Sequence, residues 1–344
     1  MNPKDREKQN INENTSSQDV QQEPQIQPEQ QPTAVDQEAY VDETALTISE
    51  AEAKQKIYTP GMLIRRRFFS RKIAVFGLIV FSLIVLFVVL YYIFGDPDAA
   101  YRINRAFRNE PPSTTFWLGT DNVGRDMFAR LMEGGQVSLL VGLVAVLIQV
   151  LIGMLVGGIA GFYGGWIDNL LMRFLEIVQS FPFTPLAITV SALLGVRVTP
   201  NQKLLVVIGI IGLLSWPGLA RMIRGQILSL REMEFVQAAK ALGVRDGRII
   251  TKHLLPNTVA YIIVNATIGM AGAILSEASL SFLGLGVPSS TPTWGNLINA
   301  GSNMFILRTR PWLWIPPGAA IFLTVMCVNL IGDGMRDAID PKSR

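Results

Sequence analysis

The sequence predicts an all-α integral membrane protein with six transmembrane helices, and three observations lead to that prediction. Hydrophobic residues make up 49% of the 344-residue chain and charged residues only 17%, with a mean hydropathy of +0.34. The apolar residues lie in long runs, close to the about 20 residues that one bilayer crossing needs. Basic residues gather beside these runs, as membrane topology predicts, and the net charge of +3 is too small to indicate a nucleic-acid partner.

The first 56 residues differ in composition from the rest of the chain. They are rich in Gln, Glu, Asn and Pro and have almost no apolar clusters. Such a segment cannot bury enough apolar surface to offset its ordering entropy, so 1–56 is expected to be a disordered cytoplasmic tail. A solvated tail without an essential role is favoured over a regulatory or partner-binding arm. A basic juxtamembrane segment, 57–72, follows and leads into the membrane domain, 73–344.

The six spans are taken from the uncharged or nearly uncharged runs. The first ends in the aromatic pair Tyr91-Tyr92, which suits a membrane interface. The second has glycines at four-residue spacing, which places small residues on one helical face and permits close helix packing. The predicted spans are about 73–94, 137–161, 167–196, 204–220, 258–283 and 313–332.

The basic flanks predict the orientation of the chain. Arg65, Arg66, Arg67, Arg71 and Lys72 precede the first span, and this Lys/Arg bias marks the cytoplasmic side. Six crossings then return the C-terminus to the cytoplasm. The same count places the basic loop 221–257 on the cytoplasmic side as well.

The loop 221–257 is too large and too basic to be a simple connection between spans. Helix-forming residues from Phe235 to Leu242 are followed by Gly243, a typical helix C-terminus, and Pro256 stops the next segment. A short helix here would either dock into a groove on another protein or rest on anionic lipid. The residues alone leave both alternatives open.

The chain has few residues that suggest chemistry of its own. It contains no P-loop, no nucleophile elbow and no HExxH sequence, so we predict no catalytic residues and no enzyme activity. The single cysteine, Cys327, and the single histidine, His253, exclude an internal disulfide framework and a multi-histidine metal site. We therefore predict no metal ligands.

Ionisable residues inside the predicted spans are the usual sign of ion or substrate pathways. Arg173 and Glu176 are one helical turn apart, and a structural pair at the interface is favoured over a proton relay. Glu277 lies in the fifth span. It is a candidate for lining a translocation path, and the alternative is that it satisfies neighbouring backbone groups.

Several sequence blocks match one family in order and spacing. In the basic loop the matching run is Gln237-Ala238-Ala239, Gly243 and Leu255-Pro256. The other blocks are Leu118-Gly119-Thr120-Asp121, Gly124-Arg125-Asp126, Gly161-Phe162-Tyr163-Gly164-Gly165, Glu277 to Gly286, and Asn329 to Asp333. The chain from about residue 60 onward resembles the permease subunits of binding-protein-dependent ABC importers, and specifically the second permease of the oligopeptide/dipeptide (and nickel) group. In that family the loop motif is Glu-Ala-Ala, Gly, Ile-x-Leu-Pro, so Gln237 replaces a glutamate and His253 an isoleucine.

The resemblance implies a fold, partners and a site. The fold is that of the type I ABC importer permeases, and the loop motif forms a coupling helix that contacts an ATPase through Gln237, Ala238, Ala239, Gly243, Leu255 and Pro256. The implied partners are a second permease, two ATP-binding subunits that carry ATP and Mg, and an extracytoplasmic peptide-binding protein, all at a bacterial inner membrane. The missing carboxylate at Gln237 puts in doubt any ion pair with the ATPase.

The substrate is the least defined part of this interpretation. Short peptides are the favoured substrate, and nickel or another solute is the alternative within the same family. A stand-alone secondary transporter would predict inverted repeats, broken helices in both halves and more charge at the membrane midplane, none of which the sequence displays convincingly. A third interpretation is a membrane scaffold or assembly protein. It would leave the basic loop 221–257 without an energy-coupling partner.

Overall fold

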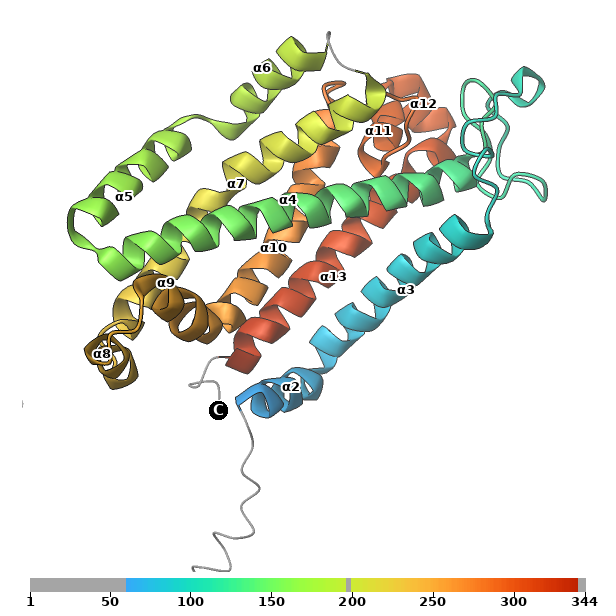
Figure 1. Ribbon diagram of the computed structural model, residues 1–344. Helices are drawn as coiled ribbons and strands as arrows, with labels where there is room; N and C mark the ends of the chain where they lie inside the picture. Colours follow the sequence, from blue (N-terminus) through green and yellow to red (C-terminus); the bar gives the residue numbers. More distant parts are fainter. Residues whose placement is uncertain (1–59, 196–198, 340–344) are drawn as a thin grey trace, which may run out of the picture. The chain divides into compact units, whose positions relative to one another are not determined.

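The computed structural model describes residues 60–195 and 199–339. The predicted tail, 1–56, and the start of the juxtamembrane segment lie outside the described residues. Within the described ranges the secondary structure is helical, apart from one isolated bridge between Thr120 and Asp126. Five helices are long and apolar enough to cross a membrane, and there are six crossings when one bent helix pair counts as a span (Figure 1). The chain is therefore a multi-pass membrane protein, as predicted.

Five long helices and several short ones follow the chain order. The long helices are α3 (Lys72–Phe94), α4 (Met127–Tyr163), α7 (Pro200–Leu230), α10 (Leu255–Phe282) and α13 (Ile315–Ile339). The shorter helices are α2 (Pro60–Ser70), α5 (Gly165–Ser180), α6 (Phe183–Gly195), α8 (Glu234–Ala241), α9 (Asp246–Ile249), α11 (Trp294–Ile298) and α12 (Met304–Thr309).

The helix of the second span begins earlier than the predicted 137, at Met127. The Asp126 side chain accepts hydrogen bonds from the backbone N–H groups of Phe128 (2.8 Å) and Ala129 (3.4 Å), which satisfies donors that a helix start leaves free. Charged residues in the first turns ended the apolar run in the sequence, but they do not end the helix.

The third predicted span, 167–196, is two helices rather than one. α5 and α6 meet at a bend of 75°. Phe181, which precedes Pro182, has extended backbone angles (φ −77°, ψ 124°). Proline disfavours helical angles in the residue before it, and this is the physical reason for the break.

The fourth helix, α7, continues well past the predicted end of its span at 220. It passes Pro217 and ends at Leu230. Arg221 and Arg224 lie on its last turns, so the charges that ended the hydropathy signal are still helical. The segment that connects α7 to α10 is therefore 231–254, shorter than the predicted loop 221–257; we call it the connecting segment.

The glycine spacing in α4 serves close packing, as predicted. A side chain at Gly153 would lie 2.9 Å from Leu219 of α7, and one at Gly161 would lie 2.9 Å from the Arg224 backbone oxygen. α4 and α7 form the most extensive helix contact in the described part of the chain. The last long helix, α13, packs against both α3 and α10.

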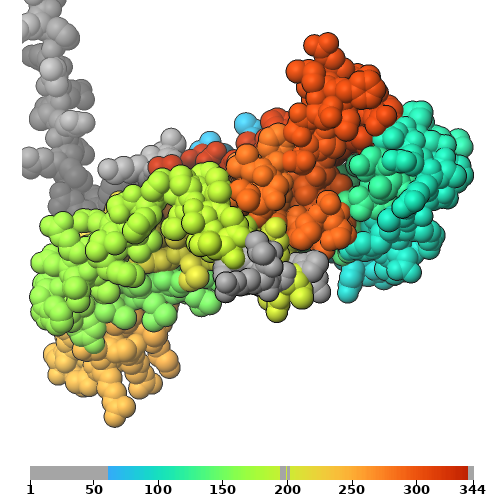
Figure 2. All heavy atoms as spheres, turned by 90° about the horizontal axis from the view of Figure 1, so that it is seen from above, coloured from blue at the N-terminus to red at the C-terminus, as the bar shows by residue number. Residues whose placement is uncertain are grey.

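The long helices have two differently built ends. The connecting segment, with α8 and α9, lies at one end, which we call the connecting end (Figure 1). Residues 95–126 and 283–314, which include α11 and α12, lie at the other end, which we call the loop end. In Figure 2 these two stretches, coloured teal and orange-red, adjoin each other, while the connecting segment protrudes at the opposite side.

Candidate functional site

The predicted coupling helix is present as α8, Glu234–Ala241, and Gly243 ends it. Gly243 has a positive φ of +73°, a conformation that L side chains rarely adopt. Its N–H donates to the Lys240 carbonyl (2.9 Å), and the Val244 N–H donates to the Ala239 carbonyl (3.1 Å). This pair of bonds is the Schellman motif, which turns the chain sharply away from the helix axis.

One face of α8 is anchored in an apolar cluster. Val236 is completely buried and Ala239 is 7% exposed. They pack with Ile249 and Leu254 of the connecting segment and with residues at the ends of α4, α7 and α10, namely Phe162, Ile223, Ile227 and Ile262. The short helix is thus joined to three membrane helices through one cluster.

The opposite face of α8 is exposed and partly apolar. Leu242 is 83% exposed and Phe235 is 43% exposed. Gln237 and Ala238 are exposed as well. Exposed apolar side chains beside an anchored helix are typical of a surface that a partner covers.

Arg231 and Gln237 add polar links between α8 and the end of α4. The Arg231 guanidinium donates to the backbone oxygens of Gly161 (3.2 Å) and Phe162 (3.3 Å), the last carbonyls of α4. The Gln237 side-chain amide donates to the Arg231 carbonyl (3.0 Å). The Lys240 ammonium lies 5.2 Å from the centre of the Phe162 ring. α8 is therefore joined to the end of α4 through hydrogen bonds as well as through packing.

The residues predicted to couple fall into two groups. Ala239 is buried and Leu255 is half-buried, whereas Gln237, Ala238, Gly243 and Pro256 are exposed. Leu255 and Pro256 lie at the start of α10, directly after a π-helical turn from Ile250 to Leu254. The helix is continuous from Asp246 to Phe282, so the prediction that Pro256 stops the segment before the fifth span is wrong. The motif therefore spans both the α8 turn and the entry into α10, and its contact with an ATPase stays a prediction.

Sequence reasoning missed an ion pair beside this site. Arg224 of α7 contacts Asp168 of α5 through two hydrogen bonds of 2.5 Å, and the Asp168 side chain is only 9% exposed. The sequence offered only two signals for this pair: Asp168 is an acidic residue near the start of the third span, and Arg224 is a basic residue just after the predicted end of the fourth span at 220. The predicted Arg173–Glu176 pair also forms, at 2.9 Å, with both side chains largely exposed.

Glu277 lies away from the connecting end, inside the helix bundle. It is completely buried in this chain and accepts hydrogen bonds from Ser281 of α10 (2.7 Å) and Ser138 of α4 (3.3 Å). Both oxygens thus have serine hydroxyls as partners, and not the backbone groups that the alternative named. A role in the translocation path stays a prediction. In the described part of the chain no cluster of three or more His, Cys, Asp or Glu residues forms a possible metal site.

Comparisons with known proteins agree with this architecture. Residues 150–344 match the model for the inner membrane component of binding-protein-dependent transport systems, and residues 59–112 match the N-terminal transmembrane domain of oligopeptide transport permease C. The chain is 41% identical to the oligopeptide transport system permease protein OppC of Escherichia coli K12, with 81% of this chain and 90% of that protein covered.

Two further relatives are similarly close. The chain is 42% identical to the dipeptide transport system permease protein DppC of Alkalihalophilus pseudofirmus, over 80% of this chain and 88% of the relative. It is 39% identical to OppC of Haemophilus influenzae, over 81% of this chain and 88% of the relative. The chain belongs to the family of inner membrane components of binding-protein-dependent transport systems, the type I ABC permeases.

Proposed function

We propose that this chain is the second permease subunit of an ATP-driven importer of short peptides. With a related permease it forms the translocation path, and an extracytoplasmic binding protein delivers the peptide. Two ATP-binding subunits carry ATP and Mg and supply the energy. The peptide assignment is supported by the relatives named as oligopeptide and dipeptide permeases at about 40% identity.

The observation that carries the energy-coupling part is the construction of α8. One face is buried against α4, α7 and α10, and the other presents Phe235 and Leu242 to a partner. Because Arg231 and Gln237 also join α8 to the end of α4, a push on the exposed face moves the membrane helices with it. ATP shifts the permease between states only if the ATPase contacts α8 differently in each state.

The proposed orientation places the connecting end in the cytoplasm of a bacterial cell, at its inner membrane. Arg245, Arg248 and Lys252 gather at this end, beside the end of a long apolar helix, as the Lys/Arg bias of cytoplasmic loops predicts. The loop end then faces the binding protein.

Reconstitution of the whole complex tests this function. The four membrane and ATPase subunits are placed in liposomes, and ATP hydrolysis is measured with a peptide-loaded binding protein. We expect the loaded binding protein to stimulate hydrolysis and to drive peptide into the lumen. Stimulation by nickel with no response to peptides would refute the substrate assignment.

A further inference from the structure

The loop end contains a cavity of about 470 Å³ that lies away from the connecting segment. Its walls come from the loop before α4, the first turn of α4 and the stretch around α11 and α12. A volume of this size is within the about 300–1,000 Å³ typical of small-molecule sites. The lining includes a polar side, formed by Asp121, Arg125 and Arg130, and an apolar side, formed by Met127, Leu297 and Leu313.

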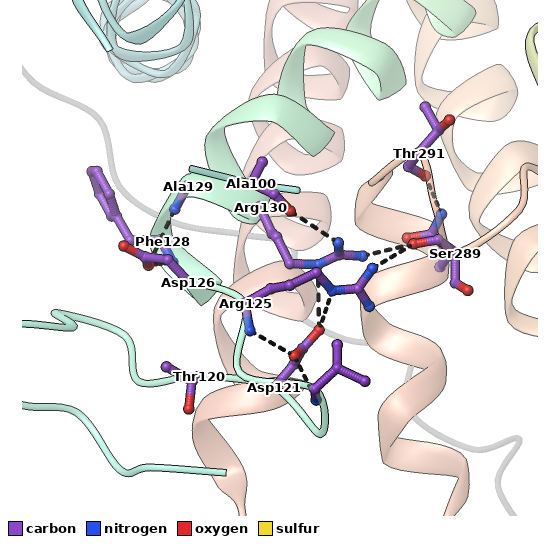
Figure 3. Close-up of polar contacts among 12 residues, drawn as sticks. Ala100, Thr120, Asp121, Arg125, Asp126, Phe128, Ala129, Arg130, Ser289 and Thr291 are labelled. Atoms are coloured by element: carbon purple, nitrogen blue, oxygen red, sulfur yellow. Dashed lines mark hydrogen bonds and ion pairs between the residues drawn. The ribbon is translucent and has the colours of Figure 1, made fainter. Parts of the chain in front are cut away.

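The polar side has two guanidinium groups held in place. Figure 3 shows Arg125, from the loop before α4, and Arg130, from the first turn of α4, both extending toward Ser289. The Arg130 side chain is 3% exposed and donates to the backbone oxygens of Ala100 (3.2 Å) and Ser289 (3.0 Å). Arg125 donates to the same Ser289 oxygen at 3.4 Å, a long bond. Backbone oxygens thus fix both cations without neutralising either.

Asp121 neutralises only one of the two cations. Its Oδ2 is 2.7 Å from Arg125 Nε and 3.9 Å from Arg130 Nε. Its Oδ1 accepts from the backbone N–H groups of Val123 and Arg125, both at 2.9 Å. Asp121 is the one acidic residue among the described residues that line the cavity, so one positive charge is left over.

A hydrogen-bond donor is also left over on this side. Arg130 Nε is buried and has no hydrogen-bond acceptor among the described residues. A buried donor without an acceptor costs free energy, and the nearest carboxylate oxygen, Asp121 Oδ2, lies 3.9 Å away, beyond hydrogen-bond distance. Two of the three asparagine amides that line the cavity are already used: Asn296 donates to the Thr291 carbonyl (2.7 Å), and Asn299 donates to the Phe282 carbonyl.

These features select one class of ligand. A cation is excluded because the excess charge is positive and both Asp121 oxygens are occupied. A purely apolar ligand would leave the excess positive charge of the lining without a counter-charge. A carboxylate matches the planar fork of a guanidinium, and the apolar wall accepts a small aliphatic group beside it.

We propose that the cavity binds a short peptide through its C-terminal carboxylate, with Arg125 and Arg130 as the cationic partners. The proposal rests on the proposed function and extends it to a peptide site on the permease itself. A peptide is favoured over an acidic side chain of a docked protein for two reasons. Arg130 lies 3% exposed at the back of the cavity, and the volume exceeds what one carboxylate side chain fills.

Equilibrium binding to the complete membrane complex tests the site. The complex is placed in lipid nanodiscs without the binding protein, and binding of radiolabelled Ala-Ala is compared with that of Ala-Ala amide. We expect Ala-Ala to bind about ten- to a hundredfold more tightly, because the amide lacks the charge-assisted hydrogen bonds. Arg125→Gln should weaken Ala-Ala binding to a similar extent and remove the preference over the amide.

Two variants complete the design. Ala300→Phe fills the cavity without changing a charge and should also weaken Ala-Ala binding. Arg102→Gln is the matched control, because Arg102 is on the same loop with a 66% exposed side chain and contacts only Asp96 among the described residues. It should bind Ala-Ala like the wild type.

The outcomes separate the site from the transport function. If wild-type liposomes import Ala-Ala but neither Arg125→Gln nor Ala300→Phe changes its binding, the site is wrong and the function stands. If Arg125→Gln weakens docking of the binding protein while Ala-Ala does not bind, the two arginines serve a protein carboxylate and the proposal is overturned. If wild-type liposomes import no peptide at all, the proposed function itself fails.

Discussion

The connecting end and the loop end of the long helices hold their segments in different ways. At the connecting end, α8 is fixed mainly by apolar packing of Val236 and Ala239, and its other face stays exposed. At the loop end, a nearly buried carboxylate, Asp121, gathers two arginines and two backbone N–H groups. Packing is non-directional and tolerates small movements, whereas a buried polar network has one good geometry. The comparison indicates that α8 itself is held less rigidly than the segment around Asp121; we call the two regions the movable end and the fixed end.

Removal of the loop-end carboxylate tests the fixed end and has the largest expected effect. Asp121→Asn removes the counter-charge of Arg125, whose side chain is 16% exposed, and leaves it uncompensated beside Arg130, whose side chain is 3% exposed. Breaking such a buried pair costs about 3 kcal/mol. We expect a lower thermal unfolding temperature and faster proteolysis within 95–126. Asp96→Asn is the control, because its pair with Arg102 is exposed, and equal losses in both variants would contradict the distinction between the two ends.

A change of the turn after α8 tests the movable end. Gly243→Val places a β-branched residue at a φ of +73°, which costs about 1–2 kcal/mol and disfavours the turn. We expect normal membrane insertion, with peptide uptake per ATP hydrolysed reduced about tenfold. Gly243→Asn, which tolerates this conformation, should retain most uptake.

A second control for the turn comes from a nearby glycine. Gly247 in α9 has open space around it and no positive φ. If Gly247→Val uncouples uptake as strongly as Gly243→Val, the effect comes from the size of the side chain and not from the turn.

The Gln237–Arg231 contact has a smaller expected effect. Gln237→Glu removes the donor to the Arg231 carbonyl, a bond worth about 1 kcal/mol, so coupling should fall about two- to fivefold. Gln237→Leu removes the donor without adding charge and should behave alike. Improved coupling in Gln237→Glu with reduced coupling in Gln237→Leu would indicate that charge, not the internal hydrogen bond, matters at this position. Peptide uptake and ATP hydrolysis are measured for complexes that carry each of the two variants.

Deletion of the tail has the smallest expected effect. Residues 1–56 lack the apolar residues to form a core, so their removal should leave uptake within about twofold of the wild type. Uptake is compared at equal amounts of complex in the membrane. A large loss of uptake at normal expression would assign the tail an essential role.

The sequence predicted elements well where local rules decide them. The apolar runs located the crossings, the glycine spacing predicted the close face of α4, and Gly243 predicted the end of α8. The sequence contains prolines at 182 and 185, yet the 75° bend between α5 and α6 was not predicted. The apolar run continues through the bend, so hydropathy alone does not reveal that the helix axis changes direction. Arg221 and Arg224 were assigned to a loop because a hydropathy window cannot distinguish a charged helix turn from a loop.

Contacts between distant residues were beyond the reach of the sequence. Asp168 and Arg224 lie on different helices, and only the packing of α5 against α7 brings them together. The same is true of the loop-end cavity, which Asp121 and Ser289 border from opposite parts of the chain. Gln237 was identified only as a substituted glutamate. Its hydrogen bond to the Arg231 carbonyl gives the amide a role that a carboxylate, which has no N–H, does not fill.

The buried Glu277 carboxylate sets a limit on how the helices slide. Ser138 of α4 donates to Glu277 of α10 and also accepts from the Trp294 N–H of α11, so one hydroxyl joins three helices. A shift of α4 by one turn along α10 would leave a charge or a carboxyl group in an apolar interior without partners, at a cost of several kcal/mol. Near Glu277 the helices therefore keep a fixed register. If α8 transmits movement as proposed, we expect a displacement that begins there to reach the loop end as a tilt of the joined helices, not as a sliding of one helix along another.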